Sequence, residues 1–388
     1  MGVLRFLLAF AVVVFHSGVP VFGMKTIPGN TCVELFFIIS GFYMEMILSD
    51  HYARKRSFYL SRFFRLWPLF IVIALCYLVF QTGYELVAQK QYTVPDARIN
   101  SRGNVWVETS VYFSNLLMVG QDIFSWFYLS PSGTPHFFYS TFMNGTDSNG
   151  VAWAGYLRWN EPAWSLGLEI WFYLLVPFLH RLRNVFLITL LLLSISLRIL
   201  LIRTIDWHTY FFFPTQFYLF VLGMLAYRFR GWLQMNRRTF GFSYALLLAA
   251  IALYRYLPVP EYLLRFVILP VLLFWTINKM FVRFSKLKWD RFVGDLSYPV
   301  YITHSFVFLV LPRVLELLLP AMNSNFVTAA CYAAVVSFSA MWVLKAEKKL
   351  NRFRWMLFKS KPAITALPQK GQPASRLLTK VKEDIVQQ

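Results

Sequence analysis

Residues 163–203 read AWSLGLEIWFYLLVPFLH, then RLRN, then VFLITLLLLSISLRILLIR. The first and third parts are apolar stretches of 18 and 19 residues. An α-helix needs roughly 20 such residues to cross the hydrocarbon core of a bilayer. The short linker between them carries Arg181 and Arg183, as cytoplasmic turns often do. This segment therefore predicts two membrane-spanning helices joined on the cytoplasmic side.

The rest of the chain repeats this pattern in both directions. Of its 388 residues, 58% are hydrophobic and only 14% are charged, against roughly 25% charged in a soluble domain. This composition excludes a soluble enzyme and predicts an all-α polytopic membrane protein with about ten transmembrane helices. We expect these spans at about residues 3–22, 31–49, 62–81, 163–180, 185–203, 209–229, 239–257, 262–282, 293–316 and 325–345.

Lys and Arg gather in every second loop of this arrangement. The basic loops are 50–65, 181–183, 228–238 and 279–291, whereas the loops between them carry few charges. The positive-inside rule therefore predicts that both termini lie in the cytoplasm. The same rule accounts for most of the net charge of +20, so we infer no nucleic-acid partner.

The long predicted outer region, residues 82–162, contains a segment that is difficult to classify as a membrane span or a loop. Val105–Tyr128 is moderately apolar but carries polar residues such as Asp122. A further crossing there would invert every later loop, so we expect a re-entrant or interfacial element, or a helix buried against the bundle. Residues 1–345 then form one membrane domain, and 346–388 form a basic cytoplasmic tail.

Cysteine usage and the N-terminal residues add two expectations. Cys32, Cys76 and Cys331 are widely spaced in or beside apolar stretches, which favours packing roles and predicts neither disulfides nor a metal site. The first apolar stretch begins at Val3 without the features of a cleavable signal peptide. We therefore expect it to remain as the first membrane helix.

Ionisable residues inside apolar spans are functional candidates, because burying them is costly. Arg5 and His16 share one face of the first span, about 16 Å apart along the axis. Glu34 and Glu169 enter from the outer edge to a depth similar to that of His16. A histidine beside a carboxylate suits general base catalysis. The structural alternatives are a neutral His16 in a helix contact, Glu34 at the membrane rim, and Glu169 in an interhelical hydrogen bond.

Two further polar sets lie near the predicted cytoplasmic side. Arg62 and Arg65 are three residues apart and thus on one helix face, which suits a phosphorylated ligand or ordinary anchoring at the membrane surface. The second set is a polar stripe that runs along one helix face from the cytoplasmic side toward the middle of the membrane. It consists of Ser297, Tyr301 and His304. This stripe could line a ligand path or make contacts between helices.

The chain resembles acyltransferase family 3, a family of bacterial integral-membrane O-acyltransferases. The resemblance covers nearly the whole length, and Glu34 and Cys32 replace the more common Asp and Gly of their motif. It rests on five motifs in order: Arg5 with ten residues before His16, the GNTCVELFFIISG segment at 29–41, RFFRLWP at 62–68, WSLGLE at 164–169 and SYPVYITH at 297–304.

The resemblance implies that an acyl group, usually acetyl, passes from cytoplasmic acyl-CoA to a sugar hydroxyl. The acceptor would be a surface polysaccharide or its lipid-linked precursor at the bacterial inner membrane. Arg62 and Arg65 would hold CoA phosphates, and the pantetheine arm would pass Arg5 and the Ser297, Tyr301 and His304 stripe toward the middle of the membrane.

The same resemblance assigns His16 as the base that takes the proton of the acceptor, with Glu34 or Glu169 orienting its ring. An acyl-histidine intermediate is the alternative mechanism. Aromatic side chains of the outer region would stack on sugar rings or anchor the protein in the bilayer, as with Trp106, Trp126, Trp153, Trp159 and Trp164.

Two other functional classes remain possible on the sequence. A transporter or flippase of lipid-linked saccharides would also need charges within the membrane, together with related halves and interrupted helices at matching positions. A structural or partner-binding membrane protein would have no use for His16, Glu34 and Glu169 at one depth.

Overall fold

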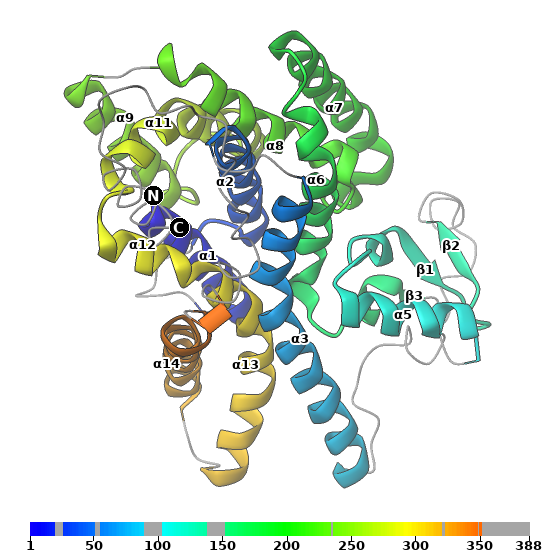
Figure 1. Cartoon of the computed structure of the whole chain (residues 1–388). Helices are drawn as coiled ribbons and strands as arrows, with labels where there is room; N and C mark the ends of the chain where they lie inside the picture. Colours follow the sequence, from blue (N-terminus) through cyan, green and yellow to red (C-terminus); the bar gives the residue numbers. More distant parts are fainter. Residues whose placement is uncertain are drawn as a thin grey trace, which may run out of the picture. The chain divides into compact units, whose positions relative to one another are not determined.

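The computed structural model describes residues 1–19, 26–50, 55–88, 103–137, 152–233, 236–319, 323–347 and 349–350. The chain divides into two units, Met1–Ala340 and Met341–Gln388, and the candidate site described below belongs to the first. A helix lies at each of the ten predicted positions (Figure 1). All of them belong to the first unit, apart from the last two residues of the final helix. These helices are α1 (Gly2–Ser17), α2 (Gly29–Asp50), α3 (Lys55–Ala88), α6 (Trp164–Leu179), α7 (Asn184–Ile205), α8 (Phe213–Arg228), α9 (Arg237–Ala252), α11 (Leu269–Phe284), α13 (Ser297–Leu318) and α14 (Ser324–Trp342).

Seven helical segments within the described residues are long and apolar enough to cross a bilayer. The remaining three helices, α1, α8 and α9, have 16 residues each, or about 24 Å of helix. The prediction of a mainly helical chain with many membrane-spanning segments is therefore confirmed. The seven segments are Gly29–Ser49, Lys55–Gly83, Glu161–Leu179, Asn184–Ile202, Glu261–Phe284, Lys288–Leu318 and Ser324–Glu347.

Helix α2 packs closely against α8 because glycine stands on both sides of their contact. A Cβ atom at Gly41 would lie 1.9 Å from the carbonyl oxygen of Phe220, and one at Gly223 would lie 2.0 Å from that of Ile38. Close approach of backbones through small residues is a common way for membrane helices to associate. The ring of Phe220 then stacks between Phe37 and Phe172, at centroid distances of 4.6 Å and 4.4 Å.

Both ends of α1 are defined by specific contacts. Asp290, on the short helix α12 (Lys288–Asp295), accepts hydrogen bonds from the amides of Gly2 and Val3 at 2.8 Å and 3.1 Å. These bonds satisfy donors that the first turn of a helix leaves open. At the other end, Gly18 adopts a left-handed conformation with φ of 68° and stops the helix. His16 consequently stands in the last turn of α1.

The outer region differs from the sequence prediction in containing β-structure. Helix α5 (Val105–Leu117) is followed by three short strands, β1 (Phe127–Leu129), β2 (Pro135–Phe137) and β3 (Ala152–Trp153). They form an antiparallel sheet in the order β2-β1-β3. The all-α prediction missed this sheet because strands of two or three residues are too short to show an alternating pattern.

Helix α5 spans 13 residues, or about 20 Å, and its Trp106 is 85% exposed. Its buried Asn115 joins it to the segment before α6: the side-chain amide donates to the carbonyl of Leu157 at 3.1 Å, and its oxygen accepts from the amide of Trp159 at 2.8 Å. The predicted re-entrant or interfacial role of this helix stays a prediction.

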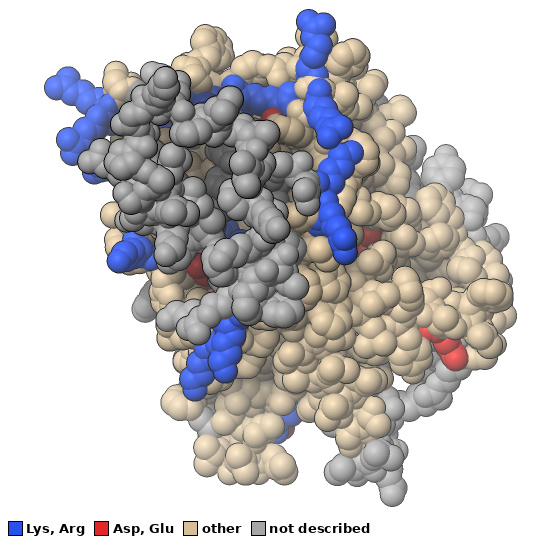
Figure 2. Space-filling view, viewed as in Figure 1, with Lys and Arg blue, Asp and Glu red and all other residues tan. Residues whose placement is uncertain are grey.

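Basic side chains dominate the charged surface of the face drawn in Figure 2. Lys and Arg lie at the left of the view, where Figure 1 shows α9 and α12, and in a column that runs down from the top, where Figure 1 shows α7. The loops predicted to be cytoplasmic include those next to these helices. The orientation of the termini remains a prediction, and most of the predicted basic tail, residues 351–388, lies outside the described residues.

Candidate functional site

A cavity of about 350 Å³ opens among α1, α2, α7, α13 and the end of the outer region. Its wall combines aromatic rings with arginines and His16. Such a mixture of apolar faces and a few convergent polar groups is typical of ligand-binding sites. The lining residues are Val12, Phe15, His16, Gly29, Asn30, Val33, Trp153, Arg158, Glu161, Pro162, Trp164, Arg198, Ile202, Thr209, Tyr210, Phe211, Arg265, Phe266 and Tyr301.

His16 presents an exposed imidazole to this cavity. Its Nδ1 lies 2.9 Å from the carbonyl oxygen of Val12, one helical turn earlier. Because a carbonyl oxygen can only accept a hydrogen bond, Nδ1 carries the proton in this contact. The Nε2 atom of the neutral ring is then the one with a free lone pair for accepting a proton.

His304 is the side chain of the predicted polar stripe that meets His16. The two rings are 5.0 Å apart between centroids, and His304 is fully buried. The Nδ1 of His304 donates to the carbonyl of Tyr301 at 2.6 Å, which fixes its tautomer in the same way.

The other two members of the stripe follow α13 toward the cavity. Ser297, at the first turn, donates to the carbonyl of Gly294 at 2.6 Å. The hydroxyl of Tyr301 lies 3.0 Å from the carbonyl of Pro162 and 2.8 Å from the hydroxyl of Ser165. Tyr301 lines the cavity, so the stripe begins near α12 and ends beside His16.

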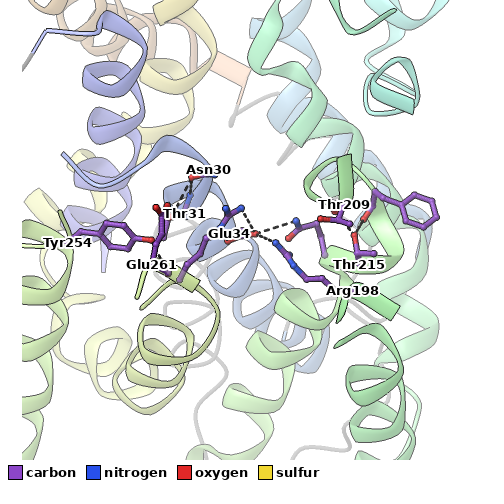
Figure 3. Close-up of polar contacts among 11 residues, drawn as sticks. Asn30, Thr31, Glu34, Arg198, Thr209, Thr215, Tyr254 and Glu261 are labelled. Atoms are coloured by element: carbon purple, nitrogen blue, oxygen red, sulfur yellow. Dashed lines mark hydrogen bonds and ion pairs between the residues drawn. The ribbon is translucent and has the colours of Figure 1, made fainter. Parts of the chain in front are cut away.

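Glu34 is bound by arginines and makes no hydrogen bond to His16 among the described contacts. Its Oε2 accepts from Nε of Arg265 at 2.6 Å, and its Oε1 accepts from Nη2 of Arg265 at 3.0 Å and Nη2 of Arg198 at 2.9 Å. Gln216 donates to Oε1 at 3.3 Å. Figure 3 shows Glu34 beside Arg198, with dashed lines running from its carboxylate to neighbouring side chains. At His16, the carbonyl of Val12 is the described hydrogen-bond partner of the ring, which Glu34 or Glu169 was expected to orient.

Glu169 belongs to a different group of charges. Its Oε2 accepts a hydrogen bond from the hydroxyl of Tyr173 at 3.2 Å, and its carboxylate interacts electrostatically with Arg5 and Arg65. The guanidinium of Arg5 also lies over the ring of Tyr43, 5.6 Å from its centroid. Glu169 thus shares the environment of the arginines rather than hydrogen bonding to His16 among the described residues.

The predicted arginine pair at the start of α3 joins this environment. Arg62 is buried, donates to the hydroxyl of Ser61 at 3.2 Å and interacts electrostatically with Tyr173. Arg65 is half-buried and interacts with the same Glu169 as Arg5. We refer to Arg5, Arg62 and Arg65 as the arginine group. It lies toward the N-terminal end of α1, whereas His16 lies at the C-terminal end.

Three arginines of the cavity wall were not singled out by the sequence analysis. Arg198 and Arg265 hold Glu34 as described above. Arg158 is 5% exposed and donates through Nη1 to the hydroxyl of Ser125 at 2.6 Å and the carbonyl of Gln121 at 3.3 Å. Burial lowers the pKa of Arg158 to about 10.

Asp122 lies close to Arg158 in the outer region and is fully buried. Its Oδ1 accepts a hydrogen bond from the indole of Trp171 at 3.3 Å, while its Oδ2 has no hydrogen-bond partner among the described residues. Burial raises the pKa of this carboxyl to about 7, although the hydrogen bond and the charge of Arg158 oppose the shift.

A family model described as an acyltransferase domain matches residues 1–345. The chain belongs to acyltransferase family 3. The predicted resemblance is confirmed, and together with the apolar helices it identifies an integral, multi-pass membrane acyltransferase. Comparison with curated proteins and with solved structures found no match.

Within this member of acyltransferase family 3, one sequence signal could have revealed two of the missed arginines. Arg198 and Arg265 stand inside the predicted spans 185–203 and 262–282, and an arginine within the membrane is a functional candidate. Arg158 lies in the outer region, where charge is unremarkable, so only the folded structure reveals its burial. No group of three or more His, Cys, Asp or Glu side chains within the described ranges is placed to hold a metal ion.

Proposed function

We propose that this protein is an O-acyltransferase of the bacterial inner membrane with both termini in the cytoplasm. It transfers an acyl group, acetyl in the first instance, from cytoplasmic acyl-CoA to a sugar hydroxyl of a surface polysaccharide or its lipid-linked precursor. The observation that carries this proposal is the position of His16, whose exposed ring faces a cavity of about 350 Å³ with its Nδ1 held by the carbonyl of Val12.

His16 acts as the general base in this reaction. Its Nε2 removes the proton of the acceptor hydroxyl while the hydroxyl oxygen attacks the thioester carbonyl. A C–O bond forms, the C–S bond breaks, and CoA leaves as a thiolate that takes the proton back from the imidazolium. The C-terminal end of α1 favours this imidazolium, because the last turn of a helix carries a partial negative charge.

An acyl-histidine intermediate uses the same atom in a different way. In that mechanism Nε2 of His16 attacks the thioester carbonyl, the C–S bond breaks and CoA leaves as a thiolate. The sugar hydroxyl then attacks the acyl-imidazole, the C–N bond to His16 breaks, and the hydroxyl proton passes to the CoA thiolate. His304 stands behind His16 at a centroid distance of 5.0 Å and positions the ring in either mechanism.

The arginine group supplies the donor site in this proposal. Guanidinium groups match phosphate oxygens in geometry and charge, so Arg62 and Arg65 suit the phosphates of CoA. Arg5 lies on the path from there to His16, eleven residues earlier on the same helix. The Glu169 carboxylate, which interacts with Arg5 and Arg65, holds these arginines in position.

The cavity supplies the acceptor site. Its aromatic lining offers flat apolar faces of the kind that stack on sugar rings, including Trp153 and Trp164, two of the tryptophans noted in the sequence. Trp164 also packs against Tyr210 and Phe211, at centroid distances of 4.3 Å and 4.8 Å, which fixes its orientation.

The test is transfer of label from radiolabelled acetyl-CoA to glycan in membranes that contain the chain. We expect His16→Ala to reduce transfer by about 10² to 10⁴-fold, the usual contribution of a general base. The control is His136→Ala, a histidine of the outer strand β2. Equal transfer by the wild type and His16→Ala would contradict the assignment, and movement of glycan across vesicles without label transfer would favour the flippase.

A further inference from the structure

Two arginines of the cavity wall keep hydrogen-bond donors without partners. Arg198 is 6% exposed, and its Nε and Nη1 are buried with no hydrogen-bond acceptor among the described residues. The same holds for Nε of Arg158, which is 5% exposed. Leaving a buried charged donor unsatisfied is costly, so such groups point to a binding partner. Both side chains line the cavity.

The charges around the cavity do not cancel. Among the described residues that line it, three are arginines, Arg158, Arg198 and Arg265, and one is a carboxylate, Glu161. Glu34 lies behind the wall and, through its bonds to Arg198 and Arg265, neutralises one further positive charge. The three arginines therefore outnumber Glu161 and Glu34, and the low dielectric around the cavity strengthens their attraction for an anion.

The arginines are also held rigidly. Arg265 lies in a π-helical turn, Leu264–Ile268, a distortion that is frequent at functional sites. The ring of Phe266 lies beneath both guanidiniums, 4.3 Å from Arg198 and 4.9 Å from Arg265. Glu34 also hydrogen bonds to both groups, and Figure 3 shows its contact with Arg198. Donors fixed in this way lose little entropy when an anion binds.

We propose that the acceptor is an anionic saccharide, whose carboxylate or phosphate group binds at Arg198 and Arg158 while a hydroxyl of the same molecule faces His16. The anion supplies the acceptor atoms that the free guanidinium donors lack, and the aromatic rings of the cavity hold the sugar. This inference rests on the proposed function and narrows its substrate class. A neutral saccharide could accept these hydrogen bonds through its hydroxyl oxygens but would leave the positive charge of the arginines uncompensated.

The test is binding to the full chain in lipid nanodiscs without any acyl donor. Methyl β-D-glucuronide and methyl β-D-glucoside differ only in a carboxylate at C6, and glucose 1-phosphate supplies a phosphate instead. We expect at least one of the two anionic probes to bind about ten- to a hundredfold more tightly than the glucoside, as a charge-assisted hydrogen bond contributes. Which of them binds tells carboxylate from phosphate.

Arg198→Lys tests the assigned residue without removing its charge. Lysine can still pair with Glu34 but lacks the donors Nε and Nη1, so we expect the preference for the anionic probe to fall to less than threefold. Arg158→Lys should lower it as well. The matched control is Arg255→Lys, an arginine outside the cavity that pairs with Glu261 at 3.7 Å. Unchanged thermal unfolding of the variants would show that the fold is intact.

Equal binding of the glucoside and both anionic probes would overturn the inference, and so would an anion preference that survives both Arg198→Lys and Arg158→Lys. No binding by either anionic probe would overturn it as well. Because no donor is present, these outcomes are independent of acyl transfer. Failure of the proposed function is read separately, from the absence of label transfer from acetyl-CoA.

Discussion

Two walls of the cavity each place arginine near a buried carboxylate, with different results. In the membrane wall, formed by α2, α7 and the π-helical turn, Glu34 accepts four hydrogen bonds from Arg198, Arg265 and Gln216. In the wall formed by the outer region, the side chain that donates to Asp122 is the neutral indole of Trp171. Arg158, although close by, donates instead to Ser125 and to a backbone carbonyl.

The difference shows that a buried charge needs two things to be stable: hydrogen-bond partners for its polar atoms and an opposite charge nearby. Glu34 meets both conditions and can remain ionised. Asp122 meets neither fully, and its pKa rises to about 7. One wall thus has fixed charges, and the other carries a carboxyl that can change its charge near neutral pH.

Glu34→Gln should produce the largest loss of stability. An amide at this position cannot compensate two buried arginines, and breaking a buried ion pair typically costs about 3–5 kcal/mol. Glu169→Gln should cost less, because the amide can still accept the hydrogen bond from Tyr173 and no arginine is hydrogen bonded to Glu169 among the described contacts. The free energy of unfolding, measured by chemical denaturation in detergent micelles, checks both variants.

The matched control is Glu261→Gln. Glu261 pairs with Arg255 at 3.7 Å, and both side chains are exposed. Pairs of this kind contribute up to about 1 kcal/mol. If all three Glu→Gln variants lost the same unfolding free energy, the idea that Glu34 differs from an ordinary charge pair would be wrong.

The sequence predicted the helices well because membrane spans are long and apolar. Its failure in the outer region has a physical cause: strands of two or three residues, such as β1 and β3, carry no readable period. Helices α1, α8 and α9, shorter than a bilayer is thick, were predicted with longer bounds because apolar residues continue beyond the helix ends.

Part of the site could also be predicted. His16 and the arginine group follow from charges in apolar stretches and from the family resemblance. Depth matching placed Glu34 and Glu169 beside His16, but depth along the membrane does not give rotation about the helix axis. The structure directs Glu34 to Arg198 and Arg265, and these partners lie more than 160 residues away in sequence.

Asp122→Asn should remove a pH dependence of stability. Because the folded-state pKa of about 7 exceeds the ordinary aspartate pKa of 3.8, folding favours the protonated carboxyl. The wild type therefore loses stability as pH rises from about 4 to 7, by up to about 1.4 kcal/mol per pH unit. Asn cannot ionise, so its advantage over Asp should grow across this range and level off above it. Asp122 lies outside the candidate membrane spans.

Unfolding in detergent at pH 5 and pH 8 checks this expectation. We expect a difference of roughly 2–3 kcal/mol between the pH dependences of the two proteins. Glu34→Gln is the contrasting variant, because its loss of stability should be present at both pH values. If the difference in unfolding free energy between the wild type and Asp122→Asn were the same at pH 5 and pH 8, Asp122 would be stabilised as an anion, as Glu34 is.

The double substitution Arg62→Ala and Arg65→Ala should affect the proposed donor site without affecting either wall of the cavity. We expect acyl-CoA to bind about ten- to a hundredfold more weakly, because each arginine contributes charge-assisted hydrogen bonds to phosphate. Binding of the saccharide probes should remain unchanged. Calorimetry with acetyl-CoA measures the first and the nanodisc assay the second. Unchanged acyl-CoA affinity would return Arg62 and Arg65 to the role of membrane anchors.

Tyr301→Phe should give the smallest effect, because it removes one hydroxyl at the place where α13 meets both the cavity and the start of α6. That hydroxyl bonds to the carbonyl of Pro162 and to Ser165, and a neutral hydrogen bond contributes about 1 kcal/mol. We expect this loss in unfolding free energy together with a lower kcat and a nearly constant KM for acyl-CoA. A rise in KM alone would instead mean that Tyr301 contacts the donor directly, and would extend the donor path along the polar stripe to the cavity wall.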